Sequence, residues 1–327
     1  MGERQVGGKT LARKFIAVAF GLAIASAQPA LAEDVGGADL TAPTAPNEQN
    51  LPTMLTGTLA KVRASGVIVI GYREASFPFS YLRPGAVEPL GYSIDLCKGI
   101  VDEVVREFDG APVRVAWQMV TPDSRIDAVT SGKVDLECGS TTSNIERQKI
   151  VAFSPVIFVA GTKLMTRRGS GIHSFRDLTG KTLVVTSGTT NETAMRRLND
   201  KYGLGITIIA ARDHDESYEA LAAGKADAFA TDDVLLSGLI ASKKSGATME
   251  VVGDFITYEP YAIMFRKDDP QMSDAVRRAF AVMAGDGALV ANYHKWFLRP
   301  TPTGESIDLP MSLQLTEALR AMGVDEF

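Results

Sequence analysis

The sequence predicts an α/β protein built from two similar α/β lobes that are joined by two crossings of the chain. Three observations support this fold class. Predicted strands alternate with predicted helices along the chain, as they do in α/β sheets. A short pattern of helix end, glycine, lysine and aspartate occurs once in each half, at residues 131–135 and 223–227. Two segments between the halves, 156–161 and 253–258, have the positions expected of the crossings.

In the first half of the chain, strand and helix patterns alternate in a way that predicts a parallel sheet. Residues 66–71 form an unbroken β-branched run, which is typical of a strand buried on both faces. Residues 97–108 place apolar side chains three and four positions apart, which predicts an amphipathic helix after Gly91. We expect the larger lobe to comprise residues 55–157 and 258–327. Its further predicted elements are strands at 113–119, 134–138 and 261–265 and helices at 124–130, 271–284 and 288–297.

The second half repeats the alternation, and we expect a smaller lobe over residues 161–253. In each lobe a polar residue lies eight positions beyond the repeated glycine: Ser140 beyond Gly132, and Asp232 beyond Gly224. Because ligands of open α/β sheets bind outside the carboxyl ends of strands, we expect both residues to face a shared cleft. Two crossings limit the lobes to opening and closing, as a hinge requires. The predicted elements are strands at 181–186, 206–210 and 226–231 and helices at 190–201 and 216–223.

Residues 135–147, DLECGSTTSNIER, run from a predicted strand into the first turn of a helix. The hydroxyls of Ser140, Thr141 and Thr142, with the free backbone N–H groups of such a junction, can hold an anion. Arg147, one turn into the helix, adds a planar guanidinium that matches a carboxylate at two points. The segment therefore predicts a carboxylate site. The alternative is an ordinary N-cap cluster beside a solvated arginine.

The N-terminal residues have the features of an export signal. Four positive charges flank the start of an apolar stretch at 15–25, and Ala30-Leu31-Ala32 resembles a cleavage site. The apolar stretch is too short to span a bilayer as a helix. We therefore expect a signal peptide at 1–32 and a mature chain in the periplasm. Residues 33–54, rich in Ala, Pro, Gly, Asp and Asn, are expected to be a disordered lead-in.

Composition argues against several classes of function. The formal net charge is −5 for the whole chain and about −8 without residues 1–32, which argues against nucleic acid as a partner. No spacing of Cys and His suggests a metal site, and we expect no cofactor. We expect Cys97 and Cys138 to pair, because exported proteins permit disulfides. Two buried free thiols are the alternative.

Several short segments, taken together and in this order, make the chain resemble a periplasmic amino-acid-binding protein, the soluble receptor of an ABC importer. The resemblance covers about residues 55–297 and is to the glutamate/aspartate-binding branch. It implies the two-lobed periplasmic-binding-protein fold, a clamshell that closes on an α-amino acid. It also implies an inner-membrane ABC permease as partner, and we expect a monomer. The segments are Gly71-Tyr72-Arg73-Glu74, Pro78-Phe79-Ser80-Tyr81, Gly91-Tyr92-Ser93, residues 135–148, Thr186-Ser187-Gly188-Thr189-Thr190, Asp213-His214 and Asp232-Asp233.

The resemblance implies a role for each of eight residues, and no catalytic residue. One position departs from the pattern of the branch, which tends to have a serine where this chain has Pro122. The choice between glutamate and aspartate is therefore open, and Ser124 is a candidate for the missing hydroxyl. The implied contacts are Arg147, Thr142 and Thr190 for the α-carboxylate, Asp232 and Ser140 for the α-ammonium, and Arg73, Arg125 and His214 for the side-chain carboxylate.

A count of charges leads independently to an acidic ligand. A neutral amino acid needs one cation and one anion, which Arg147 and Asp232 supply. Arg73 and Arg125 are then surplus cations, and a buried charge left unpaired costs several kcal/mol. We therefore expect glutamate or aspartate as the ligand, and rejection of uncharged analogues such as glutamine.

The two surplus arginines also have plain structural explanations. Arg73 follows a strand and can be solvated or paired with Glu74. Arg125 begins a helix and can pair with Asp123 or Asp127. In either case the side chain would have no role in binding.

Similar alternatives hold for the second lobe and for the aromatic residues. His214 lies between two aspartates, so a surface loop is an alternative to a ligand contact. We expect Asp232 to contact the ligand and Asp233 to be the N-cap of the following helix. Four aromatic side chains either wall the cleft or fill the core of the larger lobe: Tyr72, Phe77, Phe79 and Tyr92.

Fold alone does not exclude an enzyme, since some exported dehydratases of cyclic amino-acid precursors resemble these receptors. An enzyme needs a general acid or base at the reacting carbon, and none stands out. A triad of Ser187, His214 and Asp232 lacks the Gly-x-Ser-x-Gly turn. We therefore predict binding without catalysis, in which ligand docks on the larger lobe and the smaller lobe closes over it. A dehydratase-type enzyme and a receptor for a neutral amino acid such as glutamine are the alternatives.

Overall fold

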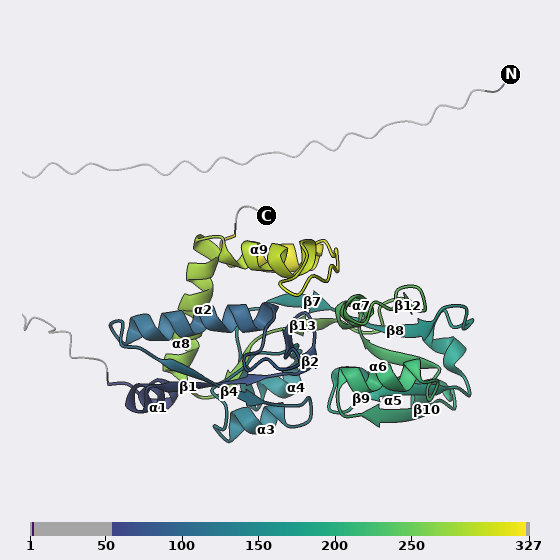
Figure 1. The fold of residues 1–327 in the computed structure, drawn as a ribbon, viewed down its shortest axis with the longest axis horizontal. Coiled ribbons are helices and arrows are strands. Elements are labelled where there is room, and N and C mark those ends of the chain that lie inside the picture. Colours follow the sequence, from purple (N-terminus) through teal and green to yellow (C-terminus); the bar gives the residue numbers. More distant parts are fainter. Residues whose placement is uncertain (1, 3–53, 325–327) are drawn as a thin grey trace, which may run out of the picture. The chain divides into compact units, whose positions relative to one another are not determined.

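The computed structural model describes Gly2 and residues 54–324. Apart from Gly2, the predicted signal peptide at 1–32 lies outside the described residues, as does the predicted lead-in at 33–54 except for its last residue. Residues 54–324 form two five-stranded sheets with helices packed on them, linked by a pair of short strands (Figure 1). The predicted α/β fold with two lobes is confirmed.

The first sheet has the strand order β4-β1-β5-β14-β6. The first three strands pair in parallel, whereas β14 is antiparallel to both β5 and β6. The sheet is therefore mixed and not parallel as predicted, because β14 returns from the other half of the chain and enters in the opposite direction. The strands are β1 (Val67–Tyr72), β4 (Arg114–Met119), β5 (Leu136–Glu137), β6 (Val151–Phe153) and β14 (Met264–Arg266).

Helix α2 (Tyr92–Glu107) is the longest element that packs on the first sheet from the N-terminal half, and it also lies against α8 (Pro270–Gly285). Its apolar stripe is buried, as its three-to-four spacing predicts. Gly91 precedes α2 with φ 145°, and an added Cβ there would lie 2.0 Å from the carbonyl oxygen of Phe79, so only glycine fits. The other helices of this lobe's first half are α1 (Gly57–Ser65), α3 (Arg125–Thr130) and α4 (Ile145–Gln148).

The second sheet has the strand order β10-β9-β11-β8-β12. Strands β9, β10 and β11 pair in parallel, and β8 is antiparallel to its neighbours β11 and β12. Its strands are β8 (Thr162–Arg167), β9 (Thr182–Thr186), β10 (Thr207–Ala211), β11 (Ala228–Asp232) and β12 (Met249–Val252). Its helices are η1 (Phe175–Leu178), α5 (Thr190–Tyr202), α6 (His214–Ala222) and α7 (Asp233–Ser242).

Two short strands, β7 (Phe158–Ala160) and β13 (Glu259–Tyr261), pair antiparallel where the chain passes from one sheet to the other. Strand β7 lies inside the predicted first crossing at 156–161. Strand β13 begins one residue after the predicted second crossing at 253–258. Tyr261 also forms a β-bridge with Thr142, in the loop that follows β5, which joins strand β13 to the first lobe.

The repeated glycine-lysine-aspartate pattern has the same structure in both lobes. Gly132 and Gly224 each have φ 72°, which ends the preceding helix. The Asp135 carboxylate accepts a hydrogen bond from the backbone N–H of Val69 at 2.9 Å, and the Asp227 carboxylate accepts one from Thr182 at 2.8 Å. In each lobe the aspartate thus joins its own strand to the neighbouring one.

An aromatic cluster fills the core of the first lobe beside the crossing strands. Phe79 and Tyr92 are fully buried in it, with ring centroids 5.1 Å from Phe158 and from Phe297 respectively. These two aromatic residues therefore fill the core. The remaining elements are the hairpin of β2 (Ala75–Ser76) and β3 (Ser80–Tyr81) and the C-terminal helices α9 (Ala288–Tyr293), η2 (His294–Leu298) and α10 (Leu313–Arg320).

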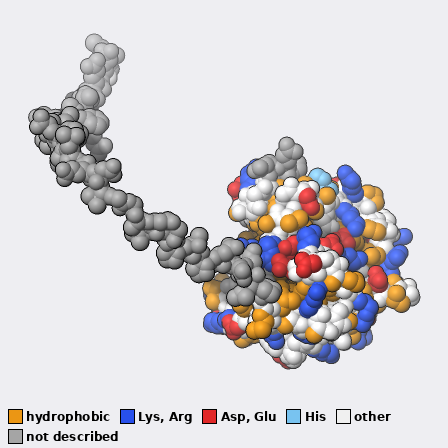
Figure 2. All heavy atoms as spheres, turned by 90° about the vertical axis from the view of Figure 1, so that its left-hand side faces the viewer, with side chains coloured by type: hydrophobic (Ala, Val, Ile, Leu, Met, Phe, Trp, Pro, Cys, Tyr) orange, Lys and Arg blue, Asp and Glu red, His pale blue; other side chains and the backbone are white. Residues whose placement is uncertain are grey.

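Cys97 on α2 and Cys138 after β5 form a disulfide that closes a separation of 41 residues. The face seen in Figure 2 shows basic and acidic side chains interspersed, with small apolar areas between them. Over residues 54–324, no helix is long and apolar enough to cross a bilayer. Within the same residues, no group of three His, Cys, Asp or Glu side chains is arranged to hold a metal ion.

Candidate functional site

A small cavity lies between the two lobes, at the carboxyl ends of strands from both sheets. Its volume is about 10 Å³, roughly the space that one water molecule needs, so the two lobes lie nearly in contact around it. Six of the eight predicted ligand residues line it: Arg125, Ser140, Thr142, Thr190, His214 and Asp232. Three residues that were not predicted complete the lining: Thr189, Asn191 and Leu235. Arg73 and Arg147 are not part of the lining, but both are buried beside it.

Arg147 lies in the first turn of α4, as the pattern of residues 135–147 predicts. Asn144 is the N-cap of α4, and its side chain accepts a hydrogen bond from the backbone N–H of Arg147 at 2.9 Å. The guanidinium donates to the carbonyl oxygen of Thr142 at 2.9 Å and to that of Gly188, in the other lobe, at 3.4 Å. Burial, followed by repulsion from Arg125, lowers the pKa of Arg147 to about 9.

Arg125 is the first residue of α3, and its side chain is buried rather than paired with a neighbouring aspartate. Its guanidinium donates to the hydroxyl of Thr141 at 3.0 Å and to the carbonyl of Gly188 at 3.4 Å, while its Nε–H has no partner in residues 54–324. Asp123, one of the proposed alternative partners, instead accepts a hydrogen bond from Ser187 at 3.1 Å. Burial lowers the pKa of Arg125.

Arg73 follows β1 and is 2% exposed, so it is not the solvated side chain of the alternative explanation. Neither of its terminal nitrogens has a hydrogen-bond partner among the described residues. Burial, and then repulsion from Arg125, lower its pKa to about 9. Buried N–H groups normally donate to a hydrogen-bond acceptor. Because the described residues offer none to these nitrogens, the Arg73 guanidinium needs an acceptor from outside the protein.

Ser140 and Thr142 approach the cavity from the first lobe. The hydroxyl of Ser140 is buried and has no partner within the described part of the chain. Ser124, the candidate for the hydroxyl missing at Pro122, instead accepts hydrogen bonds from the backbone and side chain of Thr121. Ser140 is therefore a free hydroxyl in the site and Ser124 is not.

His214 is the first residue of α6, two residues before the predicted start of this helix. Asp213 caps the helix by accepting a hydrogen bond from the backbone N–H of Glu216 at 2.8 Å. The imidazole is 3% exposed, so the surface-loop alternative is wrong, and its Nδ1 lies 2.8 Å from the Thr186 hydroxyl. Burial, with repulsion from Arg73 and Arg125, lowers the pKa of His214 well below 6.5, so the ring is neutral at neutral pH.

Asp232, at the end of β11, accepts hydrogen bonds from two buried side chains. The Asn191 amide donates to one carboxylate oxygen at 2.6 Å. The hydroxyl of Tyr261, on strand β13, donates to the other. Burial, and then repulsion from Glu259, raise the pKa of Asp232 from 3.8 to about 7. The prediction that Asp233 is the N-cap of α7 is wrong, because Asp232 occupies that position and the Asp233 carboxylate accepts from the backbone of Gly161.

Thr190 begins α5, and its hydroxyl donates to the carboxylate of Glu259 at 2.7 Å. Sequence reasoning missed Glu259, Glu137, Asn191 and Tyr261. Both glutamates are buried, at 3% and 0% exposure. A signal was present, since Glu137 lies between the apolar residues Leu136 and Cys138 in the strand predicted at 134–138, and a buried charged residue is rarely without a partner.

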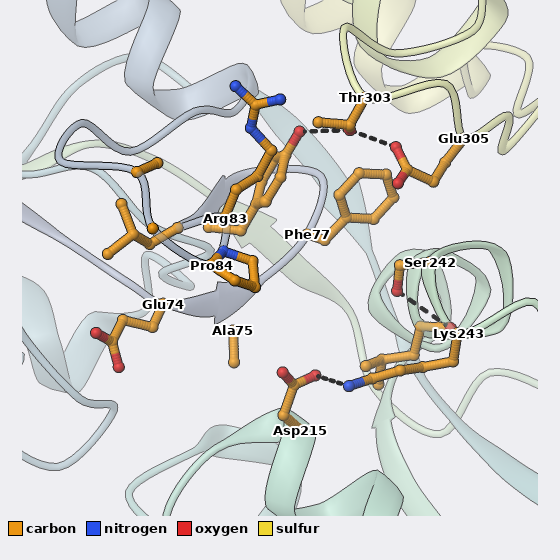
Figure 3. A pocket seen from close by; sticks show the side chains of 15 residues that line it. Glu74, Ala75, Phe77, Arg83, Pro84, Asp215, Ser242, Lys243, Thr303 and Glu305 are labelled. Atoms are coloured by element: carbon orange, nitrogen blue, oxygen red, sulfur yellow. Dashed lines mark hydrogen bonds and ion pairs between the residues drawn. The ribbon is translucent and has the colours of Figure 1, made fainter.

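A second and wider groove lies at the outer edge of the two lobes. It is lined by Glu74, Phe77 and Arg83 from the first lobe and by Asp215 and Lys243 from the second (Figure 3). Lys243 lies 3.3 Å from Asp215, and Glu74, Arg83 and Lys243 are exposed to water. Because solvent satisfies these charges, they do not require a ligand. The inner cavity is the candidate site, because its buried donors lack acceptors.

Comparison with known proteins gives one family for most of the chain. Residues 68–299 match the bacterial extracellular solute-binding proteins, family 3. The L-glutamate/L-aspartate-binding protein of Pseudomonas aeruginosa is 41% identical over 266 residues, which cover 81% of this chain and 88% of that protein. The glutamate/aspartate import solute-binding protein of Escherichia coli is 40% identical, covering 81% and 86%. An ancestral arginine-binding protein, solved with arginine, is 28% identical with a TM-score of 0.64, covering 71% and 98%.

Proposed function

The chain belongs to family 3 of the bacterial extracellular solute-binding proteins, and on this premise we propose that it binds an acidic α-amino acid, glutamate or aspartate, for import. Its relatives at 40–41% identity are glutamate/aspartate-binding proteins, which supports this ligand class. The proposal concerns binding and release only.

One observation carries the choice of an acidic ligand. Arg73 and Arg125 are buried close enough to lower the pKa of Arg73, and three of their N–H-bearing nitrogens have no acceptor in residues 54–324. The side-chain carboxylate of glutamate or aspartate would accept hydrogen bonds from both guanidiniums. A glutamine side chain would leave one surplus positive charge uncompensated.

The α-amino and α-carboxylate groups would bind at the other end of the cavity. Arg147 would hold the α-carboxylate with the hydroxyls of Thr142 and Thr190. Asp232 would hold the α-ammonium, with the free hydroxyl of Ser140 as a further acceptor. His214, neutral and buried between Thr186 and the arginines, would donate or accept at the side-chain carboxylate without adding charge. The ligand's three charges would thereby meet complementary groups.

Closure of the lobes would bring these groups together. Several hydrogen bonds in the structure join the lobes directly, among them Ser187 to Asp123 at 3.1 Å and both guanidiniums to Gly188 at 3.4 Å. These bonds exist only when the lobes are closed, and closure also buries the arginines. A ligand that neutralises those charges favours the closed state, which is the differential interaction that a ligand-driven closure requires.

Import by this family's relatives implies a membrane partner, and we propose an inner-membrane ABC permease that recognises the closed form. The periplasm is the proposed location, and the protein is proposed to act as a monomer. We propose no catalytic activity. Two carboxylates beside the cavity accept hydrogen bonds from protein donors, Asp232 from Asn191 and Glu259 from Thr190.

Calorimetric titration of the chain, unfolded and refolded to remove any bound ligand, tests the proposal. Glutamate, aspartate, glutamine and arginine would be titrated in turn. Tight binding of glutamate or aspartate with glutamine at least about tenfold weaker is expected, since each 1.4 kcal/mol of unpaired charge is a factor of about ten. A preference for glutamine or arginine would overturn the acidic ligand, and binding of none of the four would overturn the receptor.

A further inference from the structure

Glu137 is a buried carboxylate next to the candidate site that has no role in the function proposed above. It is the last residue of β5 and is fully buried. One carboxylate oxygen accepts a hydrogen bond from the hydroxyl of Thr141 at 2.6 Å. The other, Oε1, has no partner among residues 54–324. A buried carboxylate that accepts so few hydrogen bonds must be stabilised by nearby positive charge.

Both arginines of the side-chain subsite lie near Glu137. Thr141 links it to Arg125, because the same hydroxyl that donates to Glu137 accepts from the Arg125 guanidinium at 3.0 Å. Gly139 marks its closeness to Arg73: an added Cβ on this glycine would lie 2.4 Å from Glu137 Oε1 and 2.8 Å from Arg73 Cγ. The charge of Glu137 opposes the lowering of the pKa of each arginine.

We propose that Glu137 is a specificity-determining residue, which neutralises one of the two guanidiniums and leaves a net charge of one in the side-chain subsite. Without it, Arg73 and Arg125 together would present two positive charges to a ligand that carries one side-chain carboxylate. With it, the subsite matches a single carboxylate. This inference rests on the proposed function, since it explains why the same site prefers a ligand with one negatively charged side chain.

Charge balance makes an unusual prediction for a pair of substitutions. Arg73→Met leaves Arg125 and Glu137, a net charge of zero, and should abolish the preference for glutamate over glutamine. Adding Glu137→Gln to Arg73→Met restores a net charge of one from Arg125 alone. The double variant should therefore recover a glutamate preference about tenfold greater than that of Arg73→Met, because about 1.4 kcal/mol of restored attraction is a factor of ten.

Glu137→Gln alone raises the net charge to two. Its glutamate-to-glutamine preference should exceed that of the unsubstituted protein, while its melting temperature without ligand should fall, since two buried cations remain uncompensated. If this variant does not fold, the double variant still decides, because its remaining charge is that of the native subsite. Glu103→Gln is the matched control: Glu103 is also a buried glutamate, but it pairs with Arg106 on α2 and Arg278 on α8.

The experiment is calorimetric titration of glutamate and glutamine into the five proteins. Recovery of the glutamate preference in the double variant, with Glu103→Gln unchanged, supports the inference. A double variant with a glutamate preference no greater than that of Arg73→Met overturns the inference. If Glu137 had only a structural role, its substitution would weaken binding further and would not restore the preference. If the unsubstituted protein fails to prefer glutamate or aspartate, the proposed function has failed. If it prefers them and only the recovery is absent, the role of Glu137 alone is wrong.

Discussion

Arg73→Met perturbs the balance between buried charge and closure of the two lobes. In the closed structure Arg73 is 2% exposed and its terminal nitrogens have no partner among the described residues. Burial, and then repulsion from Arg125, lower its pKa to about 9, so the closed protein disfavours the charged form of this side chain. Because the folded pKa is the lower one, the unfolded chain binds the proton more tightly. The penalty is complete below about pH 9 and is relieved only as the pH rises above that value.

Methionine keeps an unbranched side chain of similar length and removes the charge. Replacing buried charge by apolar groups is often stabilising by about 1–4 kcal/mol. The penalty applies to the closed form, since an open cleft lets water reach the guanidinium. We therefore expect Arg73→Met to raise the ratio of closed to open protein without ligand by about tenfold or more, each factor of ten corresponding to about 1.4 kcal/mol.

The distance between spin labels on the two lobes measures this ratio. Asp102 on α2 and Lys201 on α5 are exposed positions for labelled cysteines, and the native Cys97 and Cys138 are already joined. Ligand-free Arg73→Met should show the shorter distance that the unsubstituted protein adopts only with glutamate. Arg277→Met, at an exposed residue paired with Asp274, is the control and should leave the distances unchanged. Identical distance distributions in ligand-free Arg73→Met and unsubstituted protein would refute the reasoning.

Three further predictions concern single residues of the site. The pKa of Asp232, raised to about 7, implies that the closed, ligand-free form loses stability as the pH rises from 4 toward 7. Glutamate binding should then release a proton below pH 7 and should tighten as the pH rises. Calorimetry in buffers of different ionisation enthalpy would measure this proton release, and Asp232→Asn should abolish it. His214 should stay neutral at neutral pH, so its ring nitrogen shifts should not show the titration of an ordinary histidine, whereas a midpoint near 6.5 would contradict its burial. Gly139→Ala should weaken glutamate binding about tenfold or more, because the added Cβ would lie 2.4 Å from Glu137 Oε1, whereas Gly285→Ala, which meets nothing within 4 Å, should bind normally.

Local sequence patterns predicted the elements that present the site, because short-range chemistry determines them. The cap residue Asn144 and the run of hydroxyls before it predicted both the start of α4 and the placement of Arg147. The predicted start of α6 is two residues later than the observed one, because the N-cap rule was not applied there. Asp213 followed three residues later by Glu216 is an N-cap signature, and reading it would have placed His214 in the first turn.

Pairing between distant segments explains what local patterns did not predict. The direction of β14 depends on the chain's return from the other lobe, which no periodicity within the strand records. Glu259 is buried beside the hydroxyl of Thr190, which donates to it from a position 69 residues away in the chain. Which charged residues lack partners is likewise a tertiary property. Arg73 and Arg125 were predicted to be surplus from a charge count, and the structure adds that their N–H groups are buried without acceptors among residues 54–324.

A crystal structure of the protein with L-glutamate tests the central claim most directly. The side-chain carboxylate should lie between Arg73 and Arg125 and accept hydrogen bonds of about 2.7–3.0 Å from nitrogens of both guanidiniums. The α-carboxylate should contact Arg147, and the α-ammonium Asp232. A side-chain carboxylate that faces solvent, or an α-carboxylate bound between Arg73 and Arg125 in its place, would contradict the assignment of these two arginines as the determinants of an acidic ligand.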